Sequence, residues 1–516
     1  MIYASPFADV VLPEMALAPW VMERFEEYGE TPALVEGETG RVLTYGELGR
    51  RVRRLAAGLQ EAGVKRGEVV GIYAPNSPEY AVAVLGISLA GGVFTTANPL
   101  YTQEELRHQM KDAGAVRLIT VRAFFEKAAA VAEALGLGAP WVMGEESYEG
   151  LLVARDPAAV EVDVQRDTAG LLYSSGTTGV AKGVEMTHFN MTAACAQVAA
   201  VEQLKRGETV VNFLPFFHIY GLQIILNGSL RQGATIVTMA RFELEGYLRL
   251  TQQHRPERAF VVPPVVIALA KSPLVDQYDV SSLETLTAGA APLGEEIARA
   301  LEQRLGIEVR QGYGMTETST IITLTPRNWK RETLDVVGVP APNMRVRLVD
   351  PATGEDVKEG ERGEVWCAGP NIMKGYLGRP EATAEMITAE GWLRTGDVGV
   401  MGKDGNLRIV DRVKELIKFK GMQVAPAELE ALLLGHAEIA DAAVIGLRDE
   451  EAGEIPMAFV VRKAGSELSE EGVMEFIAAQ VAPHKRIRRV EFREAIPKSP
   501  SGKILRRVLR DQVGGV

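Results

Sequence analysis

The apolar and polar positions of the first 335 residues follow helical and extended periods in turn. Thr44 and Glu47 have the spacing of a capping box, and an apolar stripe at helical spacing continues to Leu59. The unbroken apolar run Val69–Tyr73 comes next, and Glu79–Leu89 has the composition of a further helix. Short apolar runs separated by helical segments follow at 116–120, 210–214, 234–237, 258–262 and 283–288. This alternation predicts a layered α/β body whose sheets are largely parallel.

The pattern changes after about residue 335. Short apolar segments, among them Met344–Val349 and Gly363–Ala368, are separated by turns rich in glycine and proline. We therefore expect a small unit of antiparallel, barrel-like strands to complete the large N-terminal domain.

A third pattern begins near Asp411. Pro426 stands where a helix would start, leucines follow on one face, and a glycine stands just past the end. Two strand-like runs and a helix opened by Ser469 come next. These signals predict a compact α+β domain of its own. We place the N-terminal domain at residues 1–411 and the C-terminal domain at residues 412–516.

Composition and charge restrict the classes of protein that fit. A chain of 516 residues exceeds the size at which one hydrophobic core stops growing, so at least two domains are expected. The formal charge of −12 argues against a nucleic-acid partner. Cys195 and Cys367 lie far apart, in no metal-ligand or redox spacing, which is typical of a reducing cytoplasm.

The termini and the longest apolar runs carry no targeting signal. The N-terminal residues lack the basic and apolar regions of a signal peptide, and the C-terminal residues lack a lipidation motif. The apolar runs at 81–94 and 259–270 are too short and too interrupted to span a bilayer. We expect a cytoplasmic protein without a transmembrane segment. The sequence leaves the oligomeric state open, a homodimer included.

One run combines hydroxyl side chains, glycines and a lysine: Tyr173-Ser-Ser-Gly-Thr-Thr-Gly-Val-Ala-Lys-Gly183. Glycines let a backbone approach an anion closely, hydroxyls donate hydrogen bonds, and a lysine adds a mobile positive charge. The run is not a P-loop, because two residues separate Gly179 from Lys182. It predicts a polyphosphate-binding loop, although a flexible surface connection has a similar composition. Its candidate phosphate-binding residues are Ser174, Ser175, Gly176, Thr177, Thr178 and Lys182.

Two segments in the middle of the chain combine aromatic, polar and glycine residues. His218 lies in the aromatic and apolar run Leu214–Leu222, a setting in which a histidine more often forms a pocket wall. Gln311–Thr318 contains a tyrosine, two glycines, a threonine and a glutamate, a set able to stack a purine, hold a phosphate and bind Mg²⁺. A β-turn with a solvated Glu317 is the structural alternative.

Two segments near the C-terminus place an aspartate and a lysine beside glycines. Asp397 follows Trp392-Leu-Arg-Thr-Gly396 and is suited to accept both hydroxyls of a ribose, with support from Arg412. The basic tail Ile496–Arg507 places Lys503 after a glycine and before an apolar pair. An Asx-turn and a solvated basic face are the structural alternatives.

These five segments, in this order and at these separations, resemble the adenylate-forming superfamily of acyl-CoA synthetases, nonribosomal-peptide adenylation domains and beetle luciferases. The resemblance runs from about Thr44 to Arg510, and the run Asp411–Glu430 looks most like the branch of 4-coumarate–CoA ligases and luciferases. It implies an AMP-forming acid–thiol ligase with ATP and CoA as co-substrates. It also implies a large N-terminal domain and a small mobile C-terminal domain.

The resemblance implies a nucleotide site assembled from separate segments. The glycine-rich run would hold the β- and γ-phosphates of MgATP, although the family often has proline where this chain has Ala181. Thr316 matches a contact to the α-phosphate, and Glu317 matches a ligand of Mg²⁺. The candidate ATP- and AMP-binding residues outside the run are Gly289, Ala290, Ala291, Pro292, Gln311, Gly312, Tyr313, Gly314, Met315, Asp397, Arg412, Lys414 and Gln423.

The resemblance also implies that the C-terminal domain serves two half-reactions. Lys503 matches the lysine that bridges the carboxylate and the α-phosphate, where negative charge builds up during adenylation. The domain then rotates about a hinge that matches Asp411 and presents Lys418, while Lys420 and Gly421 border the path of CoA. The candidate catalytic residues are Lys503, Thr316, Glu317, His218 and Lys418.

The implied acyl pocket decides the substrate. Plant 4-coumarate ligases usually have a lysine where this chain has Thr287 and Ala288. We expect an aryl acid of the 4-coumarate kind or a medium- or long-chain fatty acid. The alternatives are an adenylating enzyme that transfers its acyl group to a carrier protein, a luciferase-type oxygenase, a phosphotransferase that makes ADP, and a noncatalytic nucleotide-binding protein. The candidate pocket residues are His218, Tyr220, Gln223, Thr287, Ala288, Gly289, Gly314 and Ile321.

Overall fold

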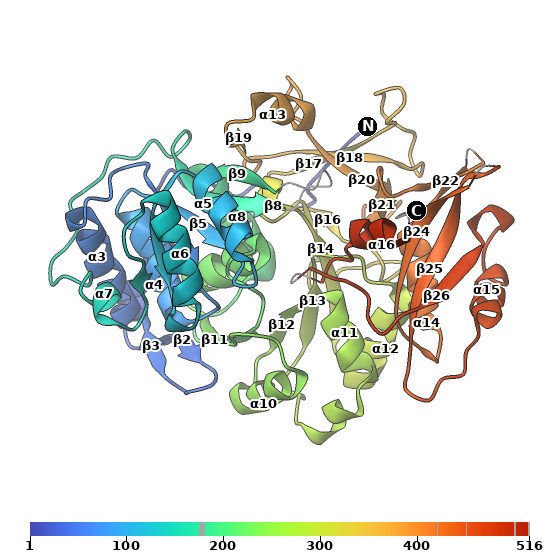
Figure 1. The fold of residues 1–516 in the computed structure, drawn as a ribbon, viewed down its shortest axis with the longest axis horizontal. Helices are drawn as coiled ribbons and strands as arrows, with labels where there is room; N and C mark the ends of the chain where they lie inside the picture. The colour runs from blue at the N-terminus through green and yellow to red at the C-terminus, as the bar shows by residue number, and fades with distance from the viewer. Residues whose placement is uncertain (175–180, 421, 450, 500–501, 514–516) are drawn as a thin grey trace.

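The structure is a computed structural model that describes residues 1–174, 181–420, 422–449, 451–499 and 502–513. Within these residues the strands form five sheets, four in the N-terminal part of the chain and one in the C-terminal part. In Figure 1 the N-terminal sheets occupy the left, the bottom and the top of the molecule, and the C-terminal sheet lies at the right. This arrangement confirms the expected α/β body with a small α+β unit at its C-terminal end.

A seven-stranded sheet contains the strand that leads into the glycine-rich run. Its order is β19-β9-β8-β5-β4-β6-β7. The strands are β4 (Val69–Tyr73), β5 (Val93–Ala97), β6 (Ala115–Thr120), β7 (Trp141–Val142), β8 (Thr168–Ser174), β9 (Lys182–Thr187) and β19 (Gly375–Tyr376). The first five pair in parallel, whereas β9 and β19 join the edge antiparallel. Ser174 at the end of β8 therefore pairs with Lys182 at the start of β9.

Helix α3 (Tyr45–Glu61) shows how the apolar pattern sets the packing around this sheet. The Thr44 hydroxyl accepts a hydrogen bond from the backbone N–H of Glu47 at 3.3 Å, so the expected cap is present. The apolar stripe of α3 is buried and packs against α4 (Pro78–Leu89). Other helices of this part are α1 (Leu17–Met22), α2 (Phe25–Tyr28), α5 (Gln103–Asp112), α6 (Phe125–Leu135) and α7 (Glu146–Glu149).

Two further sheets complete the α/β body. One has the order β10-β11-β2-β3, with β10 (Thr209–Asn212), β11 (Thr235–Thr238), β2 (Pro32–Glu36) and β3 (Val42–Thr44). The other has the order β12-β13-β14-β15-β16, with β12 (Arg258–Val261), β13 (Thr285–Ala288), β14 (Glu308–Tyr313), β15 (Thr323–Leu324) and β16 (Val339–Pro340). Their helices are α8 (His188–Glu202), α9 (Leu230–Gln232), α10 (Leu244–His254), α11 (Pro263–Lys271) and α12 (Glu295–Leu305). The strands expected at 210–214, 234–237, 258–262 and 283–288 are thus confirmed.

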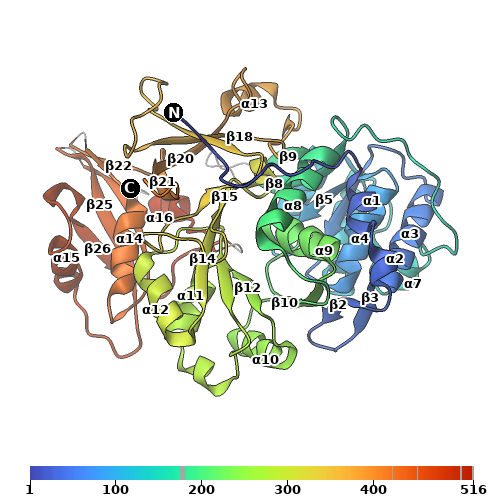
Figure 2. The same cartoon turned by 180° about the vertical axis from the view of Figure 1, so that it is seen from behind.

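An antiparallel sheet lies across the top of the molecule in Figure 1. It has the order β1-β17-β18-β20-β21, with β1 (Ile2–Ala4), β17 (Arg345–Val349), β18 (Gly363–Ala368), β20 (Leu393–Met401) and β21 (Leu407–Arg412). Figure 2 shows the N-terminal segment crossing the back of the molecule from this sheet to α1. Helix α13 (Pro380–Met386) follows β19. The expected antiparallel unit therefore includes the first residues of the chain, which the sequence did not indicate.

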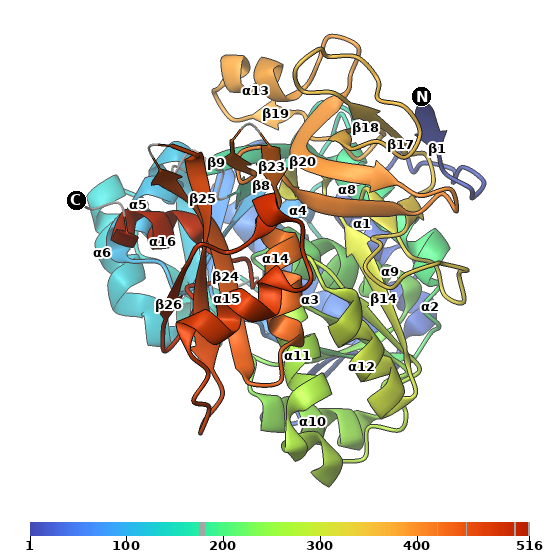
Figure 3. The same cartoon turned by 90° about the vertical axis from the view of Figure 1, so that its right-hand side faces the viewer.

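The C-terminal domain has its own sheet and its own apolar core, separate from the cores of the N-terminal part. Its strands are β22 (Ile417–Phe419), β23 (Met422–Val424), β24 (Ile439–Asp449), β25 (Gly453–Arg462) and β26 (Arg489–Phe492). Its helices are α14 (Pro426–Gly435), α15 (Glu470–Ala478) and α16 (Arg506–Val513). Figure 3 shows this domain facing the viewer, with α14 beside α12 of the N-terminal part. Strand β21 runs across the boundary that we placed after residue 411.

The helices of the described residues do not include one that is both long and apolar enough to cross a membrane.

Candidate active site

A cavity lies between residues 218–224, the sheet that contains β13, β14 and β15, and the C-terminal domain. Its empty volume is about 540 Å³, counting the part open to solvent. Most of its wall is apolar or aromatic, and its polar groups come from separate segments. The lining residues are His218, Ile219, Tyr220, Ile224, Thr287, Ala288, Gly289, Ala290, Gly312, Tyr313, Gly314, Met315, Thr316, Thr320, Ile321, Leu324 and Lys503.

The parallel strands β13 and β14 deliver two of the candidate segments to the cavity. Ala288 pairs with Gln311, so the residues that follow both strands emerge at the same edge of the sheet. A side chain at Gly314 would place its Cβ 1.7 Å from the carbonyl oxygen of Thr320, so only glycine fits this close approach. The segments expected to hold adenine and the acyl group are therefore brought together at one edge.

The side chain of Gln311, in the segment expected to hold adenine, makes its hydrogen bonds within the protein. Its Nε2 donates hydrogen bonds to the carbonyl oxygens of Leu293 (3.1 Å) and Leu334 (2.6 Å), and the side chain is buried. The amide therefore fixes two neighbouring loops. Ala291 and Pro292 likewise do not line the cavity, whereas Gly289 and Ala290 do.

His218 and Tyr220 form the wall of the cavity opposite β14. Tyr220 starts a π-helix, η2 (Tyr220–Ser229), a rare element that often occurs at functional sites. Nδ1 of His218 accepts a hydrogen bond from the backbone N–H of Tyr220 (3.2 Å), and the Tyr220 hydroxyl donates to the Thr287 carbonyl (3.1 Å). Burial, with the positive charge of Lys503, lowers the pKa of His218 to about 3. The imidazole is therefore neutral, with its proton on Nε2.

Gln223, expected in the acyl pocket, lies in the same π-helix but does not line the cavity. Its Nε2 donates to the carbonyl oxygen of Met191 (3.0 Å), and its Oε1 accepts from Nδ2 of Asn227 (2.7 Å). The side chain is buried and satisfied within the protein.

Glu317 is held by hydrogen bonds on both its main chain and its side chain. Its Oε1 accepts from the Ser174 hydroxyl and from the Tyr376 hydroxyl, both at 2.9 Å. Its carbonyl oxygen accepts from the backbone N–H of Met373 at 2.9 Å. Burial and the neighbouring carboxylate raise the pKa of Tyr376, so this hydroxyl stays protonated and donates. The sequence analysis did not identify Tyr376, because a tyrosine in a short edge strand has no special sequence signal.

Asp397 and Arg412 face each other across the hairpin of β20 and β21. Nε of Arg412 lies 3.2 Å from Oδ1 of Asp397, and the Tyr313 hydroxyl donates to Oδ2 at 2.6 Å. Burial, followed by the nearby Asp397, raises the pKa of Tyr313 well above its usual value. The expected ribose contact and its arginine support are therefore adjacent, and the aromatic ring expected near adenine is tied to them.

Lys503 is the residue of the C-terminal domain that reaches the cavity. Its backbone N–H donates to the Ser499 hydroxyl (3.1 Å), and the Ser499 N–H donates to the Lys503 carbonyl (2.8 Å). Burial, reinforced by the charge of Arg412, lowers the pKa of Lys503, while Asp397 and Glu317 oppose this shift. Across the described ranges of the chain, its Nζ has no hydrogen-bond or ion-pair partner. The ammonium group is therefore available to a ligand in the cavity.

The other C-terminal candidates lie outside the cavity in this arrangement. Lys418 and Gln423 pair across the β22–β23 hairpin, and both side chains are exposed. Lys414 and Lys420 are exposed as well. Of the remaining candidates, Ser175, Gly176, Thr177, Thr178 and Gly421 fall outside the described residues.

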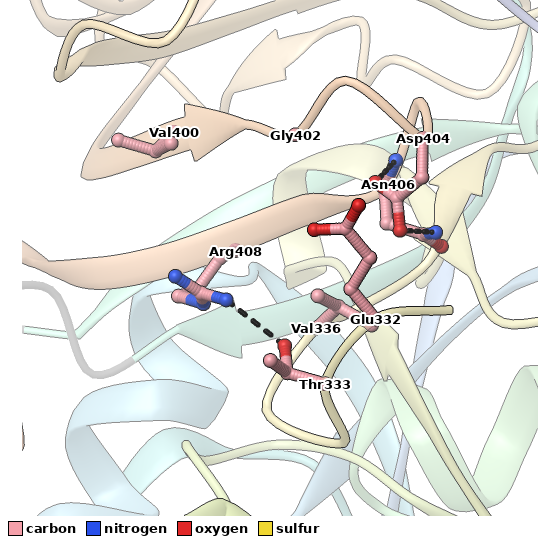
Figure 4. A pocket seen from close by; sticks show the side chains of 8 residues that line it. All are labelled: Glu332, Thr333, Val336, Val400, Gly402, Asp404, Asn406 and Arg408. Atoms are coloured by element: carbon pink, nitrogen blue, oxygen red, sulfur yellow. Dashed lines mark hydrogen bonds between the residues drawn. The ribbon is translucent and has the colours of Figure 1, made fainter.

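A second, smaller cavity lies between the β20–β21 hairpin and the loop at 332–336, and Figure 4 shows its lining. Nη2 of Arg408 donates to the Thr333 hydroxyl (2.9 Å), and Nδ2 of Asn406 donates to Oδ2 of Asp404 (2.7 Å). It contains none of the predicted site residues. We therefore assign the chemistry to the larger cavity.

Comparison with known proteins places the chain in a family. The family of AMP-binding enzymes matches residues 21–377, and the AMP-binding enzyme C-terminal domain matches residues 428–503. The 4-coumarate–CoA ligase 5 of Oryza sativa subsp. japonica is 41% identical over 524 residues, covering 99% of this chain and 97% of that protein. The 4-coumarate–CoA ligase 1 of Solanum tuberosum is 41% identical over 525 residues, covering 99% and 96%.

Solved structures agree with this placement. ATP-bound MatB from Rhodopseudomonas palustris is 27% identical, with a TM-score of 0.89 and coverage of 96% of this chain and 99% of that chain. The o-succinylbenzoate CoA synthetase MenE from Bacillus subtilis, bound to the acyl-adenylate OSB-AMP, is 27% identical, with a TM-score of 0.83 and coverage of 97% and 99%. The expectation of an AMP-forming acid–thiol ligase is confirmed. The chain belongs to the AMP-binding enzyme family, in the branch that contains the 4-coumarate–CoA ligases.

Proposed function

We propose that the protein joins an aryl carboxylic acid to CoA through an acyl-adenylate. ATP and the acid give acyl-adenylate and pyrophosphate, and the CoA thiol then gives acyl-CoA and AMP. The main support is that Lys503, from the C-terminal domain, reaches a cavity whose N-terminal wall includes Thr316, the residue before Glu317. The Lys503 ammonium and the Thr316 hydroxyl would then border one space, with the Glu317 carboxylate beside it, which suits attack of a carboxylate on a phosphate.

The wall of the cavity supports an uncharged, flat acyl group. Ile219, Ile224, Ile321 and Leu324 make its inner surface apolar. Apart from Lys503, the lining residues of the described chain carry no permanently charged side chain, so the substrate carboxylate would lie at the Lys503 end. The naming of relatives as 4-coumarate–CoA ligases supports an aryl acid over a fatty acid.

In the adenylation step the residues of this chain would orient two negatively charged groups against each other. Lys503 would hold the acid carboxylate beside the α-phosphate, with the Thr316 hydroxyl as a donor to that phosphate. Asp397 and Arg412 would hold the ribose, and Lys182 the outer phosphates. The neutral His218 would donate from Nε2 without adding charge to the acyl pocket. Closure of the C-terminal domain would keep water away from the mixed anhydride.

The donor set fits a Mg²⁺ ion that arrives with the nucleotide. The described residues hold no group of three histidine, cysteine or acidic side chains that could bind a metal by themselves. Glu317 supplies a carboxylate beside Thr316 of the cavity wall, and Mg²⁺ in nucleotide enzymes commonly uses one or two carboxylates together with substrate phosphates. When bound, the ion would neutralise charge that develops on the phosphates.

The thiol step would use the exposed hairpin of the C-terminal domain. Lys418 and Gln423 would approach the nucleotide after the domain has rotated near Asp411, and Lys414 would join them. Lys420 and Gly421 would border the CoA path. Their exposure in the present arrangement is consistent with residues that act only after such a rotation.

A panel of aryl acids and of saturated fatty acids tests the proposal. Pyrophosphate and AMP release would be measured for each acid with and without CoA. We expect the highest kcat/KM for a hydroxycinnamate-like acid, with turnover dependent on CoA. Release of ADP, or turnover only with a carrier protein as acceptor, would contradict the proposal. A preference for fatty acids would refute its aryl part alone.

A further inference from the structure

The segment Asn371–Tyr376 lies directly behind the loop that carries Thr316 and Glu317. Nδ2 of Asn371 donates hydrogen bonds to the carbonyl oxygens of Thr318 (2.7 Å) and Ile321 (2.6 Å), and this asparagine is fully buried. With the bond from Met373 to the Glu317 carbonyl, the segment fixes the backbone of the loop at several points. Tyr376, at the end of the segment, contacts the side chain of Glu317 itself.

Tyr376 contacts two charged groups at once. Its hydroxyl donates to Oε1 of Glu317 at 2.9 Å, and Nζ of Lys182 lies 4.9 Å from the centre of its ring. The tyrosine is buried, with 7% of its surface exposed. An ammonium group over an aromatic face is attracted by the ring quadrupole, most strongly where water is excluded. One tyrosine side chain therefore contacts an anion, Glu317, through its hydroxyl and a cation, Lys182, through its ring.

The two carboxylate oxygens of Glu317 differ in the number of hydrogen bonds that they accept. Oε1 accepts from both Ser174 and Tyr376. Throughout the residues that the structure describes, Oε2 accepts no hydrogen bond, which leaves it free for a ligand. Two donors on one oxygen resist rotation of the carboxylate, so the direction of Oε2 is set before any ligand arrives.

We infer that Tyr376 is a positioning residue for the metal–nucleotide complex. It directs Oε2 of Glu317 toward the metal through its hydroxyl, and it holds the ammonium of Lys182 for the phosphates through its ring. This inference rests on the proposed function, in which Glu317 binds Mg²⁺ and Lys182 binds phosphate. The contact with Glu317 can be tested separately from the contact with Lys182, because phenylalanine keeps the ring and removes only the hydroxyl.

Calorimetric titration of ATP, with excess Mg²⁺ or with EDTA, separates the two contacts without turnover. For Tyr376→Phe we expect the Kd of MgATP to rise about tenfold, while the Kd of metal-free ATP changes less than about twofold. For Tyr376→Leu we expect the Kd of metal-free ATP to rise as well, by about threefold to thirtyfold, because Lys182 loses its aromatic support.

A double-mutant cycle shows whether Tyr376 acts through Glu317. In a Glu317→Gln background, Tyr376→Phe should cause no further change in the Kd of MgATP. The control is Tyr278→Phe, since Tyr278 also donates its hydroxyl to a glutamate, Glu245 (3.0 Å), far from the cavity. It should leave both Kd values unchanged.

Two results would overturn the inference. One is an unchanged Kd of MgATP in Tyr376→Phe. The other is an equal rise with and without Mg²⁺, which would indicate only a general packing role. If instead the unmodified protein binds ATP equally well with and without Mg²⁺, the proposed function of Glu317 fails. The inference about Tyr376 would then fail as well. The two failures are distinguishable, because the first is seen in the unmodified protein and the second only in Tyr376→Phe.

Discussion

The two sides of the cavity differ in how firmly their charged groups are held. On the N-terminal side, Glu317 accepts two side-chain hydrogen bonds, and Asp397 accepts one and pairs with Arg412. On the C-terminal side, the Nζ of Lys503 has no partner among the residues that the structure describes. The nucleotide side is therefore preorganised, whereas the group expected to act on the α-phosphate is supplied by the position of a domain. We therefore expect that mutations can disturb nucleotide binding and the chemical step separately.

The largest expected effect is on the stability of the rigid side. Arg310, next to Gln311 in β14, is fully buried and makes a bidentate pair with Glu202 at 3.0 Å and 3.0 Å. Arg310→Leu would leave that carboxylate short of a partner in the core and should cost about 3–5 kcal/mol. Urea denaturation measures the loss. The control Arg24→Leu breaks an exposed pair with Glu27 and should leave the free energy of unfolding nearly unchanged.

The next effect concerns the chemistry of the mobile side. Lys503→Ala should lower acid-dependent pyrophosphate exchange about 10²- to 10³-fold and leave thioester formation from supplied acyl-adenylate nearly intact. Rapid-quench assays of the two half-reactions measure this split. Lys498→Ala is the matched control, because Lys498 lies in the same tail but pairs with Asp441 at 2.6 Å. Equal loss of both half-reactions would refute separate roles for the two sides.

The free energy of unfolding should depend on pH through Asp411, which lies between the N-terminal and C-terminal domains. Its carboxylate accepts hydrogen bonds from the backbone N–H groups of Arg412 (2.7 Å) and Ala427 (2.9 Å). Burial raises its pKa from 3.8 to about 6, against the opposing charge of Arg506. The folded protein therefore holds this proton more tightly than the unfolded chain. The resulting stability is fully present below about pH 4 and is lost as pH rises through about 6, a change of about 3 kcal/mol.

Asp411→Asn removes this titration. The free energy of unfolding of the wild type minus that of the variant should fall by about 3 kcal/mol between pH 4 and pH 7.5. Denaturation curves at intervals of half a pH unit measure the difference. A constant difference across this range would show that the carboxylate is not perturbed in the folded protein.

The smallest effect should come from a contact that docks the C-terminal domain. Nζ of Lys271, at the end of α11, donates to the carbonyl oxygen of Leu434 near the end of α14 at 2.9 Å. A cation at a helix C-terminus is favourable. Lys271→Met should lower adenylation about two- to tenfold, with thioester formation unchanged. The control is Lys330→Met at an exposed lysine, which should change neither rate. If Lys271→Met slowed thioester formation and not adenylation, the role assigned to Lys271 would be wrong.

The sequence predicted the regular elements well because local pattern determines them. Thr44 caps its helix and the apolar stripe of that helix is buried, as expected. The segments around His218, Gly289, Gly314 and Lys503 also come together at one cavity. The roles of the individual candidates stay predictions. Gln311 and Gln223 show the limit, since each amide donates to a backbone carbonyl group of a distant segment. No pattern within their own segments indicates those partners.

The sequence by itself determined the fold class and the order of the chemical segments, because periodicity, glycine content and motif spacing are local properties of the chain. The type of reaction followed from the resemblance of those segments to the adenylate-forming superfamily. Only the tertiary structure decided that, among the described residues, hydrogen bonds reach Oε1 of Glu317 and not Oε2, that Tyr376 contacts both Glu317 and Lys182, and that burial lowers the pKa of His218. Each of these depends on partners or burial supplied by distant residues. Desolvation and hydrogen-bond geometry arise only when those residues are packed together.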